Sequence, residues 1–266
     1  MKTIVYQSYR SAGVPAWLEA CLGSVRSWSE DRGFAYRFYG DEIFERVPAW
    51  YRDKTAAYPQ VATDLGRLRL ARELLDEGYE RTVWLDADVL VFDPENFRIN
   101  VETGSAFGRE VWVQADGKGG LRAYRNVHNA VAQFCRDDTF LDFYADACER
   151  IIGRADGGLP PQIVGTKLLT ALHNIVGFQL IDAVAMASPP VVRDIAGGGG
   201  AALDRLSREL EAAPAAVNLC SSLEGAVTDG VNLDAALMAA AVNRLLDDGA
   251  PVFQRVSQRV FHKLRP

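Results

Sequence analysis

Strand-like and helix-like segments alternate along the first hundred residues, and this alternation constrains the fold more than any other feature. Strand-like runs cover Thr3–Gln7, Phe34–Tyr39 and Thr82–Leu85, and helical patterns cover Pro15–Trp28 and Val61–Asp76. Such alternation predicts an α/β fold with a parallel sheet covered by helices. In sheets of this kind ligands bind beyond the carboxyl ends of the strands, so a functional site is expected there.

The second half of the chain is less regular. Two glycine-rich segments, Gly117–Gly120 and Gly197–Gly200, interrupt it, because neither a helix nor a strand keeps a run of glycines. We expect helices over residues 139–152, 162–173, 201–212 and 233–246 and a strand over residues 215–219, with Asn232 or Asp229 capping the last helix. Since there is no repeat and no clear linker, one domain with an irregular C-terminal half is expected.

Composition limits the partners and the compartment. The chain has 35 acidic and 29 basic residues, a net charge of -6, which argues against a nucleic-acid partner but not against a small anionic ligand. No apolar run approaches the roughly 20 residues that a membrane span requires, and residues 1–8 turn polar too soon for a signal peptide. The four cysteines form no CxxC pair, which fits a reducing compartment rather than a zinc site. The sequence therefore predicts a cytoplasmic protein without a transmembrane segment, either free or peripheral at the inner membrane face.

An apolar run ends in two aspartates. Within Thr82–Val91 (TVWLDADVLV), Asp86 and Asp88 are spaced i, i+2, so in extended geometry both point to the same side at the end of a buried strand. Two such carboxylates repel each other unless a cation lies nearby. Hard oxygen ligands select magnesium or manganese, and magnesium is usually held by one or two carboxylates plus substrate phosphates. The structural alternative is that both are N-cap or turn aspartates.

A second signal lies on the predicted helix over Val61–Asp76. Its apolar residues form one stripe, and Asp64 and Arg67 fall within that stripe. A functional interpretation has Arg67 facing the carboxylates or phosphates near Asp86 and Asp88, with Asp64 holding Arg67 or binding the nucleotide. The alternative is a buried structural ion pair, because residues three apart on a helix are neighbours.

These two segments together resemble a known family. Residues 62–67 (ATDLGR), followed by residues 85–89 (LDADV), are similar to the DxD-containing, nucleotide-sugar-dependent glycosyltransferases of the GT-A fold. Two branches share different parts of the pattern. The capsule-type and yeast initiating mannosyltransferase-like family shares the S/T-D-x-x-R signature and an early strand ending in glutamine. The glycogenin-like family shares the sequence pattern of residues 83–91 (VWLDADVLV).

The resemblance implies a GT-A-like, Rossmann-like mixed sheet flanked by helices. It implies one glycosyltransferase domain over residues 1–266, with residues 1–100 as the nucleotide-sugar-binding half and residues 101–266 as the acceptor-side half. The implied reaction is retaining transfer of a hexosyl group from a UDP- or GDP-sugar to a hydroxyl of a glycan, lipid-linked or protein acceptor, in surface polysaccharide or glycoconjugate synthesis. Mn²⁺ or Mg²⁺ would bridge the aspartates and the donor diphosphate as a Lewis acid.

The resemblance also implies site residues. The expected catalytic residues are Asp86, Asp88, Arg67 and Asn129. The expected donor-binding residues are Tyr6, Gln7, Asp64, Arg67, Ala87, Gly165 and Lys167, with the nucleotide base near Tyr6 and Gln7. The expected metal ligands are Asp86, Asp88 and Asn218.

The chain departs from the family at two positions. Asn218 stands where these families place a late metal-binding histidine, and Tyr6 stands where the capsule-type branch has a histidine in the first strand. The three histidines of this chain, His128, His173 and His262, are expected to be structural or exposed instead.

Two other function classes stay open. A haloacid-dehalogenase-like phosphatase also has an apolar strand followed by DxD; there Asp86 would be the nucleophile, Asp88 the general acid, and Asp229 and Asp234 the late acidic motif. That assignment leaves Asp64 and Arg67 without a role. A non-catalytic sugar-nucleotide binding module is the second alternative, and the Asn218 replacement is the feature that favours it.

Overall fold

A computed structural model describes residues 1–99, 101–155 and 158–253. The helices are α1 (Ala16–Asp31), α2 (Ala49–Lys54), α3 (Pro59–Asp76), α4 (Phe140–Arg154), α5 (Thr166–Val176), α6 (Pro189–Ala196), α7 (Ala201–Glu209) and α8 (Ala235–Asp248). The strands are β1 (Thr3–Ser8), β2 (Ala35–Tyr39), β3 (Arg81–Leu85), β4 (Val89–Val91), β5 (Ala106–Ala115), β6 (Leu121–Cys135), β7 (Gln179–Ile181), β8 (Val184–Met186), β9 (Ala216–Asn218), β10 (Val227–Thr228) and β11 (Val231–Asn232).

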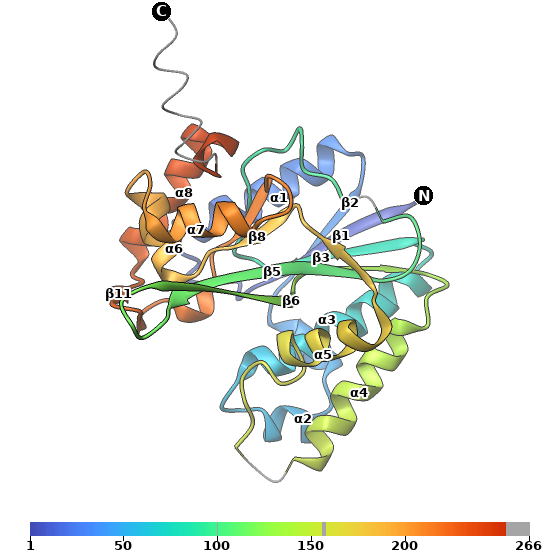
Figure 1. Ribbon diagram of the computed structural model, residues 1–266. Helices are drawn as coiled ribbons and strands as arrows, with labels where there is room; N and C mark the ends of the chain where they lie inside the picture. The colour runs from blue at the N-terminus through green and yellow to red at the C-terminus, as the bar shows by residue number, and fades with distance from the viewer. Residues whose placement is uncertain (100, 156–157, 254–266) are drawn as a thin grey trace, which may run out of the picture.

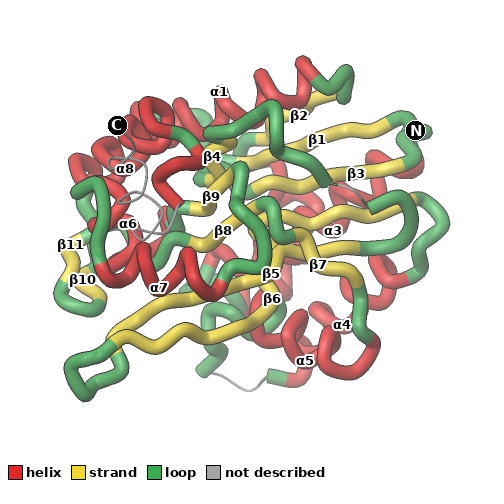
Figure 2. The backbone as a smooth tube through the Cα atoms, turned by 45° about the horizontal axis from the view of Figure 1, so that its top comes forward, coloured by secondary structure: helices red, strands yellow, loops and turns green. Residues whose placement is uncertain are grey.

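The main sheet has the strand order β2-β1-β3-β6-β5-β7 (Figure 2). Strands β1, β2 and β3 pair in parallel, as do β5 and β7, whereas β6 pairs antiparallel with both of its neighbours, β3 and β5. The α/β class and the mixed sheet flanked by helices are thus confirmed, and the strands predicted in the first hundred residues pair in parallel, whereas the sheet as a whole is mixed. The reason is the β5–β6 hairpin, which turns at the glycine-rich segment 117–120 and inserts β6 next to β3.

A second sheet, with the order β4-β9-β8, continues from the end of β3. Strand β9 pairs antiparallel with β4 and in parallel with β8, with Asn218 opposite Val89. The two sheets therefore meet at the Asp86–Asp88 segment, which connects β3 to β4.

Helices cover both faces of the main sheet (Figure 1). Helices α3, α4 and α5 lie on one face, and α1 with the α6–α8 group lies on the other. The α3 stripe predicted from the sequence is confirmed, because Val61, Leu65, Leu68, Ala71 and Leu74 are buried and the charged residues of the opposite side are exposed. Burial of this stripe fixes the direction in which the polar residues of the same face point.

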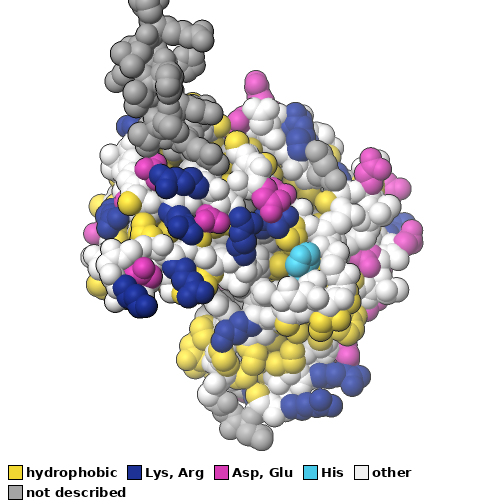
Figure 3. All heavy atoms as spheres, viewed as in Figure 1, with side chains coloured by type: hydrophobic (Ala, Val, Ile, Leu, Met, Phe, Trp, Pro, Cys, Tyr) yellow, Lys and Arg dark blue, Asp and Glu magenta, His cyan; other side chains and the backbone are white. Residues whose placement is uncertain are grey.

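Helix α5 packs differently from α3. It keeps only Leu169 fully buried, and Ile175 and Val176 near its end are 78% and 60% exposed. Apolar side chains gather on the face of the molecule that carries α4 and α5 (Figure 3). Helix α5 therefore contacts the sheet through a narrow row of side chains. Within the described residues, nothing covers much of its remaining apolar surface.

Most other element predictions hold within a few residues. The helices predicted over 139–152, 201–212 and 233–246 correspond to α4, α7 and α8, and the strand at 215–219 corresponds to β9. The predicted helix at 162–173 begins later, at Thr166, and α6 was not predicted. The cap of α8 is Asp234, whose carboxylate accepts a hydrogen bond from Leu237 N, rather than Asn232 or Asp229.

No helix among the described residues has the length and apolar character needed to cross a membrane. All four cysteines lie within the described residues and are buried free thiols. His262 lies outside the described residues.

Candidate functional site

A cleft of about 900 Å³ opens at the carboxyl ends of β1 and β3. Its lining comes from segments far apart in the sequence: the residues that follow β1, helix α3, the turn after β3, strands β5 and β6, the start of α5 and the residues that follow β9. Of the predicted site residues, those that line the cleft are Asp64, Arg67, Asp86, Ala87, Asp88, Asn129, Gly165 and Asn218. The fold therefore brings most of the predicted set to one place.

Asp86 and Asp88 lie in a tight turn between β3 and β4. The amide of Val89 donates to the carbonyl of Asp86 (3.0 Å), which closes the turn. The extended geometry expected for this pair is therefore wrong, because the chain leaves β3 at Leu85 to enter the second sheet. Both carboxylates nevertheless line the same cleft.

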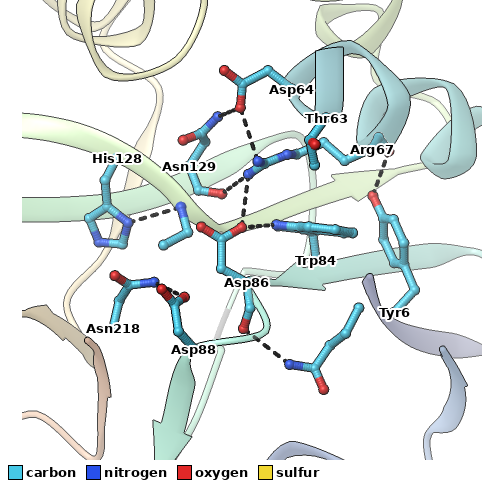
Figure 4. A network of polar contacts seen from close by, with 12 residues as sticks. Tyr6, Thr63, Asp64, Arg67, Trp84, Asp86, Asp88, His128, Asn129 and Asn218 are labelled. Atoms are coloured by element: carbon cyan, nitrogen blue, oxygen red, sulfur yellow. Dashed lines mark hydrogen bonds and ion pairs between the residues drawn. The ribbon is translucent and has the colours of Figure 1, made fainter. Parts of the chain in front are cut away.

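Arg67 is the centre of a polar network that includes Asp64, Asp86 and Asn129 (Figure 4). It reaches from α3 and donates from Nη1 to Asp86 Oδ1 (3.1 Å) and to the carbonyl of Asn129 (2.7 Å), while its Nη2 lies 3.0 Å from Asp64 Oδ1. Its guanidinium also lies over the ring of Trp84, 4.7 Å from the centroid, and Trp84 Nε1 donates to Asp86 Oδ1 (2.6 Å). The network holds the Asp86 carboxylate by one oxygen.

Burial decides the charge balance of this network. Asp64 and Arg67 are 6% and 5% exposed, and burial raises the pKa of Asp64 to about 6 against the opposing effects of Arg67 and of the Asn129 amide. Burial alone would lower the pKa of Arg67, but the Asp86 and Asp64 carboxylates outweigh it and raise the pKa. The guanidinium thus keeps its charge, which is shared between two carboxylates.

Asp88 is held by a separate set of donors. Asn218 Nδ2 donates to its Oδ1 and the amide of Ser221 donates to its Oδ2, both at 2.6 Å. Burial, followed by the negative charge of Asp86, raises the pKa of Asp88 to about 6. The charge of Asp86 therefore destabilises the charged form of Asp88 unless a cation joins the two carboxylates.

The donor set of the cleft fits a hard divalent cation held by two protein carboxylates. Within the described residues no hydrogen bond reaches Asp86 Oδ2, so this oxygen is available beside Asp88. Asn218 fits less well, because its Nδ2 faces Asp88 and its Oδ1 accepts from Cys220 N (2.9 Å). No cluster of three His, Cys, Asp or Glu side chains suited to a metal exists in the described part of the chain. Mg²⁺ and Mn²⁺ accept such a site when substrate oxygens complete the coordination.

Tyr6 and Gln7 lie beneath the cleft rather than in its wall. Tyr6 is fully buried, and its hydroxyl donates to the carbonyl of Arg67 (2.9 Å). Gln7 Nε2 donates to the carbonyl of Asp86 (3.1 Å), and its Oε1 accepts from Tyr36. Both side chains hold the backbone of the site in place, and neither lines the cleft in which a base was expected to contact them. The residues that line the cleft here are the next ones along β1 and its loop, Ser8, Tyr9 and Arg10.

Gly165 and Lys167 differ although they lie two residues apart. Gly165 lines the cleft, and a Cβ at this position would lie 3.2 Å from Asp64 Oδ2 and 3.3 Å from Asn129 Nδ2. Lys167 is exposed on α5 and does not line the cleft. The structure therefore separates Lys167 from the other predicted site residues.

Sequence reasoning missed the part of the cleft formed by the β5–β6 hairpin. The cleft-lining side chains of these strands include Glu110, Trp112, Gln114, Tyr124, Asn126 and His128. Burial lowers the pKa of His128 to about 4, so this histidine is neutral at physiological pH. No clear signal marks this set in the sequence, because polar and apolar residues do not alternate over 109–114 (REVWVQ) and the cleft-lining Trp112 is itself apolar.

The positions of Asp229 and Asp234 do not support the phosphatase assignment. Asp229 lies in the β10–β11 turn and Asp234 caps α8, and neither lines the cleft. Asp64 and Arg67, which have no role in that assignment, contact each other and the Asp86 carboxylate.

Comparison with known proteins gives a distant likeness only. No protein-family model and no curated protein matches the chain. Among solved structures, the chain is similar to a glycosyltransferase involved in the glycosylation of the major capsid of PBCV-1, with 12% identity and a TM-score of 0.45 over 90% of this chain and 98% of that one. It is also similar to mannose-1-phosphate geranyltransferase from Thermus thermophilus, with 14% identity and a TM-score of 0.29 over 62% and 67% of the two chains. At such low identities and TM-scores, the function has to come from the site itself.

Proposed function

We propose that the chain is a metal-dependent, retaining glycosyltransferase that moves a hexosyl group from a UDP- or GDP-sugar to a hydroxyl acceptor. The observation that carries the proposal is the placement of Asp86 and Asp88 in one cleft above the buried Arg67, at the carboxyl ends of β1 and β3. Acceptors of this kind are glycans, lipid-linked saccharides and proteins, and the product would serve surface polysaccharide or glycoconjugate synthesis.

Asp86 and Asp88 would hold Mn²⁺ or Mg²⁺, which supplies Lewis-acid stabilisation of the leaving diphosphate. Arg67 orients the Asp86 carboxylate, so that its second oxygen stays directed away from the network. Asn218 and the Ser221 amide orient Asp88 with one hydrogen bond to each of its carboxylate oxygens. Orientation by such neighbours keeps a ligand set rigid, which is what tight cation binding needs.

The donor lies along the strand ends in this proposal. Ser8, Tyr9 and Arg10, which line the cleft after β1, are placed to contact the nucleoside. Asn129 and Gly165 lie beside Asp64, and the absence of a side chain at Gly165 lets the Asp64 and Asn129 side chains lie close to its backbone, where the sugar is placed in this proposal. In the reaction the bond from the anomeric carbon to the diphosphate oxygen breaks, a bond to the acceptor oxygen forms, and the hydroxyl proton passes to the diphosphate.

Calorimetry with UDP and GDP, each with and without Mn²⁺, tests the proposal directly. We expect one nucleotide to bind and its affinity to depend on the metal. Absence of metal-dependent binding of both nucleotides would contradict the transferase and also the sugar-nucleotide binding module.

A panel of nucleotide sugars then separates catalysis from binding. Slow hydrolysis of one UDP- or GDP-sugar, without release of phosphate from p-nitrophenyl phosphate, is the result expected for a glycosyltransferase. Metal-dependent binding with no turnover of any donor would favour the binding module. Turnover of p-nitrophenyl phosphate that disappears in Asp86→Asn would favour the phosphatase.

A further inference from the structure

The β5–β6 hairpin presents two chemically different faces. Val111 and Val113 of β5 are buried in the core formed with α6, α7 and α8. Glu110, Trp112 and Gln114, which alternate with them, line the cleft. Because side chains of a strand alternate between its faces, one strand serves the core and the cleft at once.

The cleft-facing side chains of the two strands lie opposite one another. The register pairs Glu110 with Asn126 and Trp112 with Tyr124, and all four side chains line the cleft. We call these four residues the hairpin wall. The wall lies on the long hairpin that projects from the main sheet (Figure 2).

Glu110 is an unusual member of this wall. It is 6% exposed, and its side chain accepts one hydrogen bond, from Asn126 Nδ2 to Oε2 (2.8 Å). No Lys, Arg or His of the described residues forms an ion pair with it. A buried carboxylate normally has a cation or several donors, so a single amide leaves its second oxygen short of donors.

The aromatic members give the wall an apolar surface next to these polar groups. Trp112 and Tyr124 are half-buried, and the guanidinium of Arg122 lies over the Tyr124 ring, 4.7 Å from its centroid. Trp112 is therefore the ring that we assign to a ligand. An indole beside a carboxylate and an amide matches a ligand with an apolar face and hydroxyl donors on its rim, which is the chemistry of a pyranose.

The wall extends along β6 away from Asn129, whose side chain donates to Asp64 at the α3 end of the cleft. Strand β6 places Tyr124 and Asn126 five and three residues from Asn129, which corresponds to about 17 and 10 Å along an extended strand. The cleft, at about 900 Å³, lies at the upper end of the roughly 300–1,000 Å³ typical of ligand sites. It therefore has room for a second molecule beside the donor.

We infer that the hairpin wall is a saccharide subsite that receives the acceptor, with Glu110 and Asn126 bonding its hydroxyls and Trp112 stacking on its ring. This inference rests on the proposed function, because it assigns the acceptor class of that same cleft. The acceptor bound here is a sugar, and a hydroxyl of that sugar faces the donor end of the cleft.

The experiment is a titration with methyl α- and β-pyranosides of glucose, galactose and mannose. It is carried out by calorimetry on the free protein and again with Mn²⁺ and whichever of UDP and GDP binds. We expect at least one glycoside to bind. Glu110→Gln and Trp112→Ala should each weaken it by roughly tenfold or more while leaving metal-dependent nucleotide binding unchanged, since a hydrogen bond to a charged group contributes about 1.5–3 kcal/mol.

Two matched variants act as controls. Glu19→Gln changes an exposed carboxylate on α1, and Trp50→Ala changes an exposed tryptophan on α2, and neither residue lines the cleft. Both should bind the glycoside like the wild type. Because Glu110→Gln keeps the shape of the side chain, it remains informative if Trp112→Ala does not fold.

The outcomes separate this inference from the proposed function. Metal-dependent nucleotide binding with no glycoside binding, or with binding unchanged in Glu110→Gln, overturns the inference and leaves the transferase proposal standing. Glycoside binding that depends on Glu110 in a protein that binds neither nucleotide overturns the transferase proposal and supports a saccharide site.

Discussion

The two ends of the cleft use charge in opposite ways. At the α3 end, Arg67 is paired with Asp64 and Asp86, and Asp88 adds a third carboxylate that has only neutral donors, so negative charge remains in excess. At the hairpin wall, Glu110 has an amide partner and no ion pair among the described residues. A ligand at the first end must bring charge of its own, such as a cation with a diphosphate, whereas a ligand at the second end needs hydroxyl donors and no net charge. In the proposed function, the donor binds at the α3 end and the acceptor at the hairpin wall.

The sharpest way to break this comparison is to remove a carboxylate from the turn after β3. Asp88→Ala should lower transferase activity by roughly a thousandfold or more and abolish metal-dependent nucleotide binding, because cation stabilisation contributes several kcal/mol. Donor hydrolysis and calorimetry measure the two effects. Asp76→Ala, an exposed aspartate on α3, is the control. Normal activity in Asp88→Ala would refute the site assignment.

Removal of the Arg67 guanidinium, which pairs with both Asp64 and Asp86, is the next largest change. Arg67→Ala leaves the Asp64 and Asp86 carboxylates without their counter-charge, so it should lower the free energy of unfolding by about 3–5 kcal/mol and severely reduce turnover. Urea denaturation measures the stability. Arg69→Ala, two residues along on the exposed face, removes only a surface pair with Glu149 and should cost no more than about 1 kcal/mol. Equal losses of stability in the two variants would mean that the buried ion pairs of Arg67 contribute no more than the surface pair of Arg69.

The pH dependence of stability tests the charge balance of Asp64. Its pKa is raised from 3.8 to about 6 in the folded state, so the folded protein binds the proton more tightly than the unfolded chain. The stability that this provides is complete below pH 3.8 and is lost as the pH rises through about 6. Relative to the wild type, Asp64→Asn should therefore become more stable over this window, by about 3 kcal/mol at most. Urea denaturation from pH 4 to pH 7.5 measures the difference, and a difference that stays constant with pH would contradict the assignment.

The smallest effect is expected at Lys167. Because this side chain is exposed and lies outside the cleft, Lys167→Ala should change nucleotide affinity and turnover by less than about twofold, as is usual for surface substitutions. A loss of tenfold or more would show that α5 moves Lys167 onto the diphosphate when the donor binds.

The predictable part of the site is the part fixed by local geometry. Helical periodicity placed Asp64 and Arg67 on the buried side of α3, and the apolar run before Asp86 predicted the end of a strand. Both inferences depend on neighbouring residues of one element, for which the sequence period is sufficient.

The rest depends on how distant segments meet. The Asp86–Asp88 pair leaves the strand because β4 has to join β9, a pairing between segments more than a hundred residues apart. Tyr6 and Gln7 point beneath the cleft because β3 and α3 pack over them. The hairpin wall escaped prediction for the same reason, since the sequence of β5 does not alternate between polar and apolar residues and does not show which face of the strand meets a cleft.

The two faces of the β5–β6 hairpin have an evolutionary consequence. The core side chains Val111 and Val113 and the cleft side chains Glu110 and Trp112 alternate along one strand, so a substitution in one set leaves the other set in place. With the inferred acceptor role of the hairpin wall, we expect relatives to change which acceptor they use through a few positions of one hairpin, without altering the turn that carries Asp86 and Asp88. Among homologues, we expect the even-numbered positions from 110 to 114 to vary with the acceptor and Val111 and Val113 to remain apolar.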